Sequence, residues 1–110
     1  MATLTTQKAK TTGQAITMAA ASGGGDKVDA GDHTALLVTN GGGSSINVTV
    51  AVPGNTKYGA AEPDIVVAVA AGATKLIGPL PTDLEDTTTD RLVAVTYSGV
   101  TSVTVAAIEI

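Results

Sequence analysis

Short apolar runs separated by turn residues recur along most of this chain, and they constrain its fold more than any other feature. The clearest run covers residues 46–52, where large apolar residues stand at every second position: Ile46, Val48, Val50 and Val52. Alternation with a period of two is typical of a strand with one buried face. Because Val, Ile and Thr also suit a pleated surface, we predict strands rather than helices.

The same pattern predicts seven to eight short strands in all. The other apolar runs lie at 15–20, 34–39, 65–70, 74–77, 92–97 and 103–110. Turn signals recur about every ten residues, a spacing typical of sandwiches and barrels. We therefore predict an all-β fold, a single antiparallel β-sandwich or barrel-like domain over residues 13–110. The short glycine-rich loop at 40–45 predicts an antiparallel hairpin between the two strands that flank it.

The first twelve residues, 1–12, differ from the rest of the chain. They contain five Thr and two Lys, but little beyond Leu4 that a core would bury. We therefore predict an extended, loosely held N-terminal arm. Such an arm can add a strand to an exposed sheet edge of a neighbouring protein, and its lysines can pair with acidic groups there. The residues expected to contact a partner are Thr5, Thr6, Lys8, Lys10 and Thr11.

Composition and charge exclude several classes of protein. The 110 residues fit one domain, and the apolar fraction of 44% is enough for a core. That core must be built from small and branched side chains, since the chain has no Phe, no Trp and only two Tyr. A net charge of −4 argues against nucleic-acid binding by phosphate neutralisation. We find neither a membrane-spanning apolar segment nor a signal-peptide core near the N-terminus, so no membrane partner and no secretion are expected.

Residues that carry chemistry are few and scattered. His33 is the only histidine and there is no cysteine, so we interpret His33 as a polar residue at a strand entrance. We expect no enzymatic activity, no cofactor and no metal centre. Two glycine clusters lie in the chain, one inside a predicted break at 22–26 and the other at 41–43. Neither is followed by the Lys and Ser/Thr of a phosphate loop, so we interpret both as flexible loops. The acidic segment 83–90 lacks EF-hand spacing, which favours a solvated connection and leaves Ca²⁺ binding as the alternative.

Three segments together resemble a known class of proteins. They are residues 31–50, with the sequence GDHTALLVTNGGGSSINVTV, residues 70–81 and residues 97–108. In style and order they are similar to the small β-sandwich capsid decoration (cement) proteins of tailed bacteriophages, over most of residues 12–110. The resemblance implies a structural protein of the virion, made in the host cytoplasm, that binds the outer capsid surface and clamps neighbouring capsomers. The implied partners are the major capsid protein and further copies of the chain itself, in a homotrimer.

Two other functions stay open at this point. A phage tail or baseplate module, such as part of a tube or fibre, would share the same composition. A carbohydrate-binding or adhesive β-sandwich normally uses exposed aromatic platforms, and this chain offers only Tyr58 and Tyr97. The sequence therefore favours capsid decoration over both alternatives.

Overall fold

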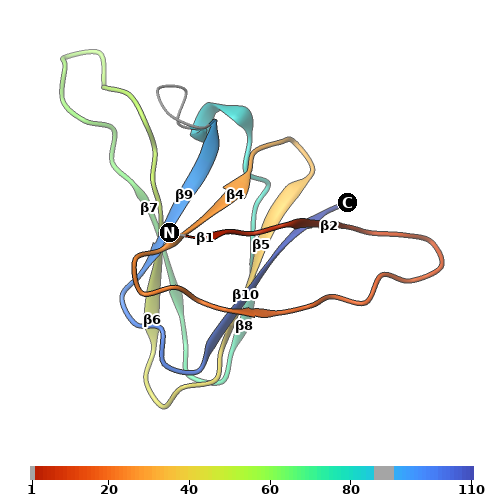
Figure 1. Cartoon of the computed structure of the whole chain (residues 1–110). Coiled ribbons are helices and arrows are strands. Elements are labelled where there is room, and N and C mark those ends of the chain that lie inside the picture. Colours follow the sequence, from red (N-terminus) through yellow and green to blue (C-terminus); the bar gives the residue numbers. More distant parts are fainter. Residues whose placement is uncertain (1, 86–90) are drawn as a thin grey trace.

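Two β-sheets packed face to face form the fold in this computed structural model, which describes residues 2–85 and 91–110 (Figure 1). The first sheet has the order β1-β4-β9-β6-β7, and the second has the order β2-β10-β5-β8. A further short strand, β3, pairs with β10 in the second sheet. The prediction of an all-β sandwich is therefore confirmed, with about ten strands in place of seven to eight.

The strand bounds follow the sequence pattern closely in the second half of the chain. The first sheet consists of β1 (Ala2–Thr3), β4 (Asp26–Asp29), β9 (Leu92–Tyr97), β6 (Ile46–Val50) and β7 (Ile65–Val69). The second consists of β2 (Thr6–Lys8), β10 (Val103–Glu109), β5 (Thr34–Asn40), β8 (Thr74–Ile77) and β3 (Ala19–Ala20). A short 3-10 turn, η1 (Thr82–Leu84), follows β8.

The core lies between the inner faces of the two sheets. The predicted buried face of β6 is confirmed for Ile46, Val48 and Val50, whereas Val52 lies beyond the strand and is half-buried. On β9 the side chains that share one face are Val93 and Val95, both buried, and Tyr97, which is half-buried. The second sheet contributes Leu36, Val38, Val103 and Val105. Val, Leu and Ile thus fill the space that aromatic side chains occupy in many sandwiches.

The predicted hairpin at 34–52 is wrong, because β5 and β6 belong to different sheets. The loop between them crosses the sandwich, and the fully buried side chain of Asn40 holds it in place. The Asn40 amide donates to the carbonyls of Ser44 and Val69, and its oxygen accepts from the Gly42 N–H. A Cβ on Gly41 would lie 2.9 Å from the Ser102 carbonyl oxygen. This glycine therefore permits a close approach of two loops, and the loop is not simply a flexible connection.

The sheets are mixed and not purely antiparallel. Strand β1 pairs with β4 in parallel, and β2 pairs with β10 in parallel, while the other named strand pairs are antiparallel. The two parallel strands and β4 were not expected, because their sequences are polar. Strand β4 begins at Asp26, the last residue of the predicted break at 22–26. Strand β3 covers only the last two residues of the predicted apolar run 15–20.

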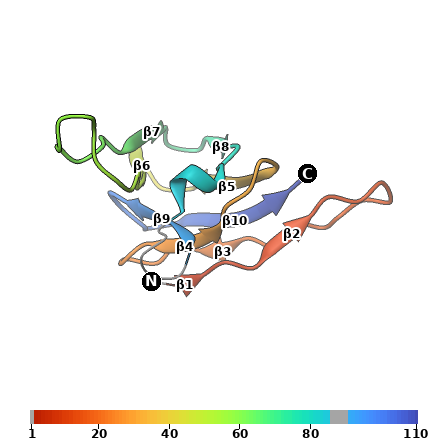
Figure 2. The ribbon, with the colours of Figure 1, turned by 90° about the horizontal axis from the view of Figure 1, so that it is seen from above.

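The N-terminal segment is bound to its own domain over residues 2–8, which differs from the loosely held arm expected over 1–12. The backbone forms β1 on the first sheet, crosses at Leu4 and Thr5, and forms β2 on the second sheet. The Leu4 N–H donates to the Lys27 carbonyl at 2.8 Å, and the Leu4 side chain packs against the core. Backbone hydrogen bonds, together with the packing of the Leu4 side chain, hold this segment. It closes one side of the sandwich, opposite β7 and β8 (Figure 2).

Candidate functional site

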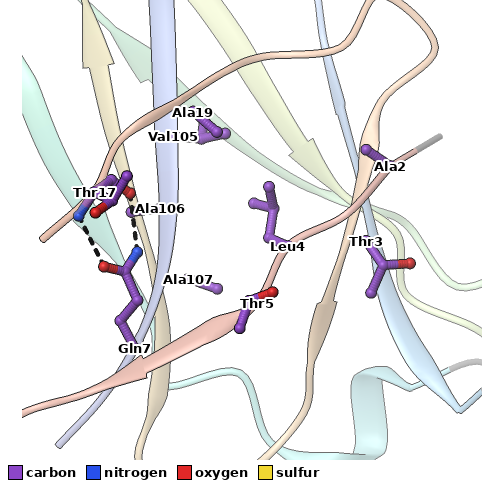
Figure 3. A pocket seen from close by; sticks show the side chains of 10 residues that line it. All are labelled: Ala2, Thr3, Leu4, Thr5, Gln7, Thr17, Ala19, Val105, Ala106 and Ala107. Atoms are coloured by element: carbon purple, nitrogen blue, oxygen red, sulfur yellow. Dashed lines mark hydrogen bonds between the residues drawn. The ribbon is translucent and has the colours of Figure 1, made fainter.

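Two loops extend well beyond the two sheets, one between β6 and β7 and one between β2 and β3 (Figures 1 and 2). The second of them, residues 9–17, is called the projecting loop below. The Gln7 side chain closes its base, since its amide nitrogen donates to the Thr17 carbonyl at 2.9 Å and its oxygen accepts from the Thr17 N–H at 2.8 Å (Figure 3). Gln7 thus offers Thr17 the donor and acceptor that a neighbouring strand would offer. The loop is therefore held at its base and is exposed along its length except at the half-buried Gln14.

The predicted contact residues are divided between this loop and the strands before it. Lys8, Lys10 and Thr11 are exposed at the base and first turn of the projecting loop, where the Gly13 N–H donates to the Lys10 carbonyl. Thr5 is exposed at the crossing between β1 and β2. Thr6 is half-buried, and its hydroxyl donates to the Asp29 carboxylate at 2.6 Å. The structure therefore brings Lys8, Lys10 and Thr11 together, and commits Thr6 to the domain itself.

A pocket of about 510 Å³ lies between the N-terminal crossing and β10 (Figure 3). Leu4 stands over it, facing small side chains of β3 and β10. The lining residues are Ala2, Thr3, Leu4, Thr5, Gln7, Thr17, Ala19, Val105, Ala106 and Ala107. None of them carries a charge. The pocket therefore has hydroxyl and amide groups at its rim but no ionisable group in its wall.

A second hollow lies at the opposite side of the sandwich, between β7 and β8. This edge groove has a volume of about 320 Å³ and an apolar wall. Its lining residues are Val50, Ile65, Val67, Leu76, Ile77, Gly78, Pro79, Leu80 and Leu84. Ile65 is 45% exposed and Leu76 is 54% exposed. Because β7 and β8 are the outermost strands of their sheets, one backbone edge of each strand is left without a strand partner.

Acidic residues flank the edge groove. Asp64 precedes Ile65, and Asp83 and Glu85 stand on either side of Leu84. The Asp64 carboxylate accepts a hydrogen bond of 3.0 Å from the Val52 N–H, and Glu85 lies 3.8 Å from Arg91. Lys75, next to Leu76, offsets part of this charge. The groove is thus an apolar strip with a mainly acidic rim.

Sequence reasoning missed the hydrogen bond between Tyr97 and the buried carboxylate of Asp26. The Asp26 carboxylate is fully buried and accepts hydrogen bonds from the Tyr97 hydroxyl at 2.8 Å and from the Ser22 N–H at 3.3 Å. Its other oxygen, Oδ1, has no partner. Burial raises the pKa of Tyr97, and the hydrogen bond and charge of Asp26 raise it further. The signal was absent from the sequence, because Asp26 stands in a polar segment that alternation does not identify as a strand.

The remaining candidates give no cluster. His33 is exposed, and its backbone carbonyl accepts from the Ile110 N–H at 2.9 Å. Among residues 2–85 and 91–110, no group of three His, Cys, Asp or Glu side chains is arranged to hold a metal ion. Of the acidic segment 83–90, residues 86–90 lie outside the described residues. No helix in the described part of the chain is long and apolar enough to cross a membrane.

The exposed surfaces available for contact in the described part of the chain include the projecting loop, with Lys8 and Lys10 at its base, and the edge groove with its acidic rim. They are made by elements far apart in the sequence and lie on different sides of the sandwich (Figure 2). Comparisons with protein-family models, with curated proteins and with solved structures find no match to this chain.

Proposed function

We propose that this protein is a capsid decoration protein of a tailed bacteriophage. It binds the outer capsid surface as a homotrimer, contacts the major capsid protein and stabilises contacts between capsomers. The observation that carries the proposal is the N-terminal crossing, which joins both sheets into one block and still leaves the projecting loop exposed. The resemblance of residues 31–50 and of two later segments to such proteins also supports it.

A rigid block with an exposed extension suits this role for a physical reason. Each copy on a lattice contributes a small contact area, and several linked contacts bind far more tightly than one. Loops that are already ordered lose little conformational entropy on binding, so more of the contact energy remains as affinity. The Gln7–Thr17 pair orders the base of the projecting loop in this way. Lys8, Lys10 and Thr11 are the residues we propose for contact with a partner.

A sugar-binding or adhesive role has less support. Tyr97 is half-buried and bonded to Asp26, which leaves Tyr58, 91% exposed, as the aromatic ring available for stacking on a sugar. A single ring makes a poor platform. A tail or baseplate module remains the rival proposal, because a rigid block with an exposed loop would suit it as well.

Cryo-electron microscopy of the virion that carries this protein tests the proposal. We expect density for the chain at threefold or quasi-threefold positions on the outer capsid, and we expect purified protein to restore that density on capsids assembled without it. Density in the tail or baseplate would overturn the decoration role and favour the rival. A virion without the protein would overturn both.

A further inference from the structure

We propose that in solution the projecting loop of one copy binds in the edge groove of a second copy. The contact is head-to-tail, because the two surfaces are different. This inference deepens the proposed function, on which the choice of a second copy as partner rests, and it names the surfaces that join the subunits. Three observations carry it: an uncovered part of the core at the groove, opposite charges on the two surfaces, and their positions on the sandwich.

The edge groove is a part of the core that no strand covers. Ile65 pairs with Val50 across β6 and β7, and residues directly opposite each other in a sheet share one face. Val50 is fully buried, yet Ile65 on the same face is 45% exposed. Leu76, across the groove on β8, is 54% exposed. Removing this apolar surface from water favours binding of a chain segment that carries an apolar side chain of its own.

The projecting loop offers such a segment. Ile16, near the end of the loop, is 38% exposed. The loop contains no acidic residue, and Lys8 and Lys10 stand at its base without an ion pair within the described residues. Glu109 lies opposite Lys8 in the pairing of β2 with β10. The loop is therefore basic and partly apolar.

Charge on the two surfaces is complementary. Asp64, Asp83 and Glu85 flank the groove, and Lys75 together with Arg91, which lies 3.8 Å from Glu85, offsets most of their charge, so the rim keeps a small negative excess. Opposite charges at the rim of an apolar contact mainly speed association and select the correct partner, while the apolar contact supplies affinity. A second copy provides both features at once, with Ile16 for the groove and Lys8 and Lys10 for the rim.

The positions of the two surfaces determine the kind of assembly. The loop begins at β2, on the side of the sandwich that the N-terminal segment closes, and the groove lies at β7 and β8 on the other side (Figure 2). A contact between different surfaces leaves one loop and one groove free in a dimer, so further copies add until the ring closes. A closed ring of three would satisfy every loop and every groove.

Disulfide trapping tests the contact directly, because the chain contains no cysteine. The variants are Ala15→Cys in the projecting loop and Leu76→Cys in the groove, purified separately and then mixed under mild oxidation. We expect a covalent dimer containing one chain of each kind, identified by mass spectrometry, and far less product from either variant alone. A disulfide formed equally well by one variant alone would mean a symmetric contact and would overturn the proposal. No disulfide in the mixture would overturn it as well.

A pair of substitutions on one strand adds a matched comparison. Ile65→Asp places a charge in the groove, whereas Val66→Asp places the same charge on the outer face of β7, where Val66 is already 58% exposed. We expect Ile65→Asp to raise the dissociation constant of self-association by more than about tenfold, and Val66→Asp to change it little. Sedimentation velocity measures this, and circular dichroism checks that both variants are folded. Equal effects of the two variants, or a wild-type protein that stays monomeric, would contradict the contact.

These results are separable from the test of the proposed function. A wild-type protein that stays monomeric in solution and still decorates capsids would overturn the loop-to-groove contact and leave the decoration role intact. A protein that forms the trapped dimer but is absent from the capsid surface would overturn the decoration role and leave the loop-to-groove contact intact.

Discussion

The Tyr97 hydroxyl donates a hydrogen bond of 2.8 Å to the buried Asp26 carboxylate, and so joins the last residue of β9 to the first residue of β4. A buried carboxylate is costly unless its oxygens are satisfied, and Asp26 Oδ1 already has no partner. The stability of the first sheet therefore depends on a hydroxyl that an aromatic ring places in the interior.

Tyr97→Phe should lower the free energy of unfolding by about 1–3 kcal/mol, because it leaves a buried acceptor with one donor fewer. Urea denaturation at neutral pH measures the change. Val48→Ala, which removes apolar volume opposite Tyr97 without touching the hydrogen bond, is a useful comparison. If Val48 and Tyr97 act independently, the double variant should lose the sum of the two changes in the free energy of unfolding. A departure from that sum measures the coupling between the two residues. A fully stable Tyr97→Phe protein would contradict this role.

Alkaline pH should destabilise the wild type through the same residue. Since the folded state raises the pKa of Tyr97, both states are neutral at this side chain below the ordinary tyrosine value, about 10, and its contribution to stability is complete there. Above that pH the unfolded state ionises first, so the free energy of unfolding falls as the pH rises. Urea denaturation between neutral pH and about pH 11 should show a steeper fall for the wild type than for Tyr97→Phe. Equal slopes would refute the assignment.

The glycine-rich loop between β5 and β6 contains a matched pair of positions. Gly41→Ala brings a Cβ to 2.9 Å from the Ser102 carbonyl oxygen, whereas a Cβ at Gly43 meets nothing within 4 Å. We expect Gly41→Ala to cost about 1–3 kcal/mol, as overpacking does, and Gly43→Ala to be close to neutral. Thermal unfolding of the two variants distinguishes a loop fixed by close approach from a merely flexible one, for which both changes would be equally mild.

Val50→Asp should destabilise the domain by several kcal/mol, on the order of 3–5, because the side chain is fully buried and the new charge has no partner. Thr96→Asp, on an exposed position of the adjacent strand β9, is the control and should be tolerated. Guanidinium denaturation gives both values. A Val50→Asp variant as stable as its parent would rule out the register described for β6.

Two deletions separate the structural and contact roles of the N-terminal region. Removing residues 2–8 eliminates β1, β2 and the Leu4 side chain that packs on the core, so we expect the free energy of unfolding to fall by about 2–5 kcal/mol. Replacing residues 10–16 by a short Gly-Ser linker keeps Gln7 and Thr17, and should leave the melting temperature nearly unchanged while weakening attachment to undecorated capsids. Unimpaired attachment after the second change would show that the projecting loop is not a contact surface.

The sequence predicts the sandwich well wherever the evidence is local. Alternation over 46–52 identifies β6 and its buried face, because every second side chain of a strand points the same way. This reasoning does not identify β4, because only Val28 of its four residues is apolar. The strand is held by its pairing with β9, which the sequence pattern does not show. The false hairpin has a similar cause: loop length predicts a turn, but the side chain of Asn40 directs the chain across the core.

The candidate surfaces were harder to predict. The edge groove takes its wall from β6, β7, β8 and η1, so no single segment of the sequence reveals it. The lysines of the N-terminal region were identified from the composition of residues 1–12, and the structure places them at the surface. The hydrogen bond of Thr6 to Asp29 could not be predicted, because it joins β2 of the second sheet to β4 of the first.

The place of β10 in the second sheet has a consequence for how the protein forms. This strand pairs with β2, β3 and β5, which come from the first forty residues, and all of these pairings span most of the chain. During synthesis β5 can already pair with β8, but β2 and β3 have no partner in the second sheet until the ribosome has released residues 103–109. Such long-range pairing slows folding, because the entropy of closing a large loop is lost before any contact is gained. We therefore expect β2 and β3 of nascent chains to stay unpaired until β10 emerges, and the second sheet to be completed in a late step.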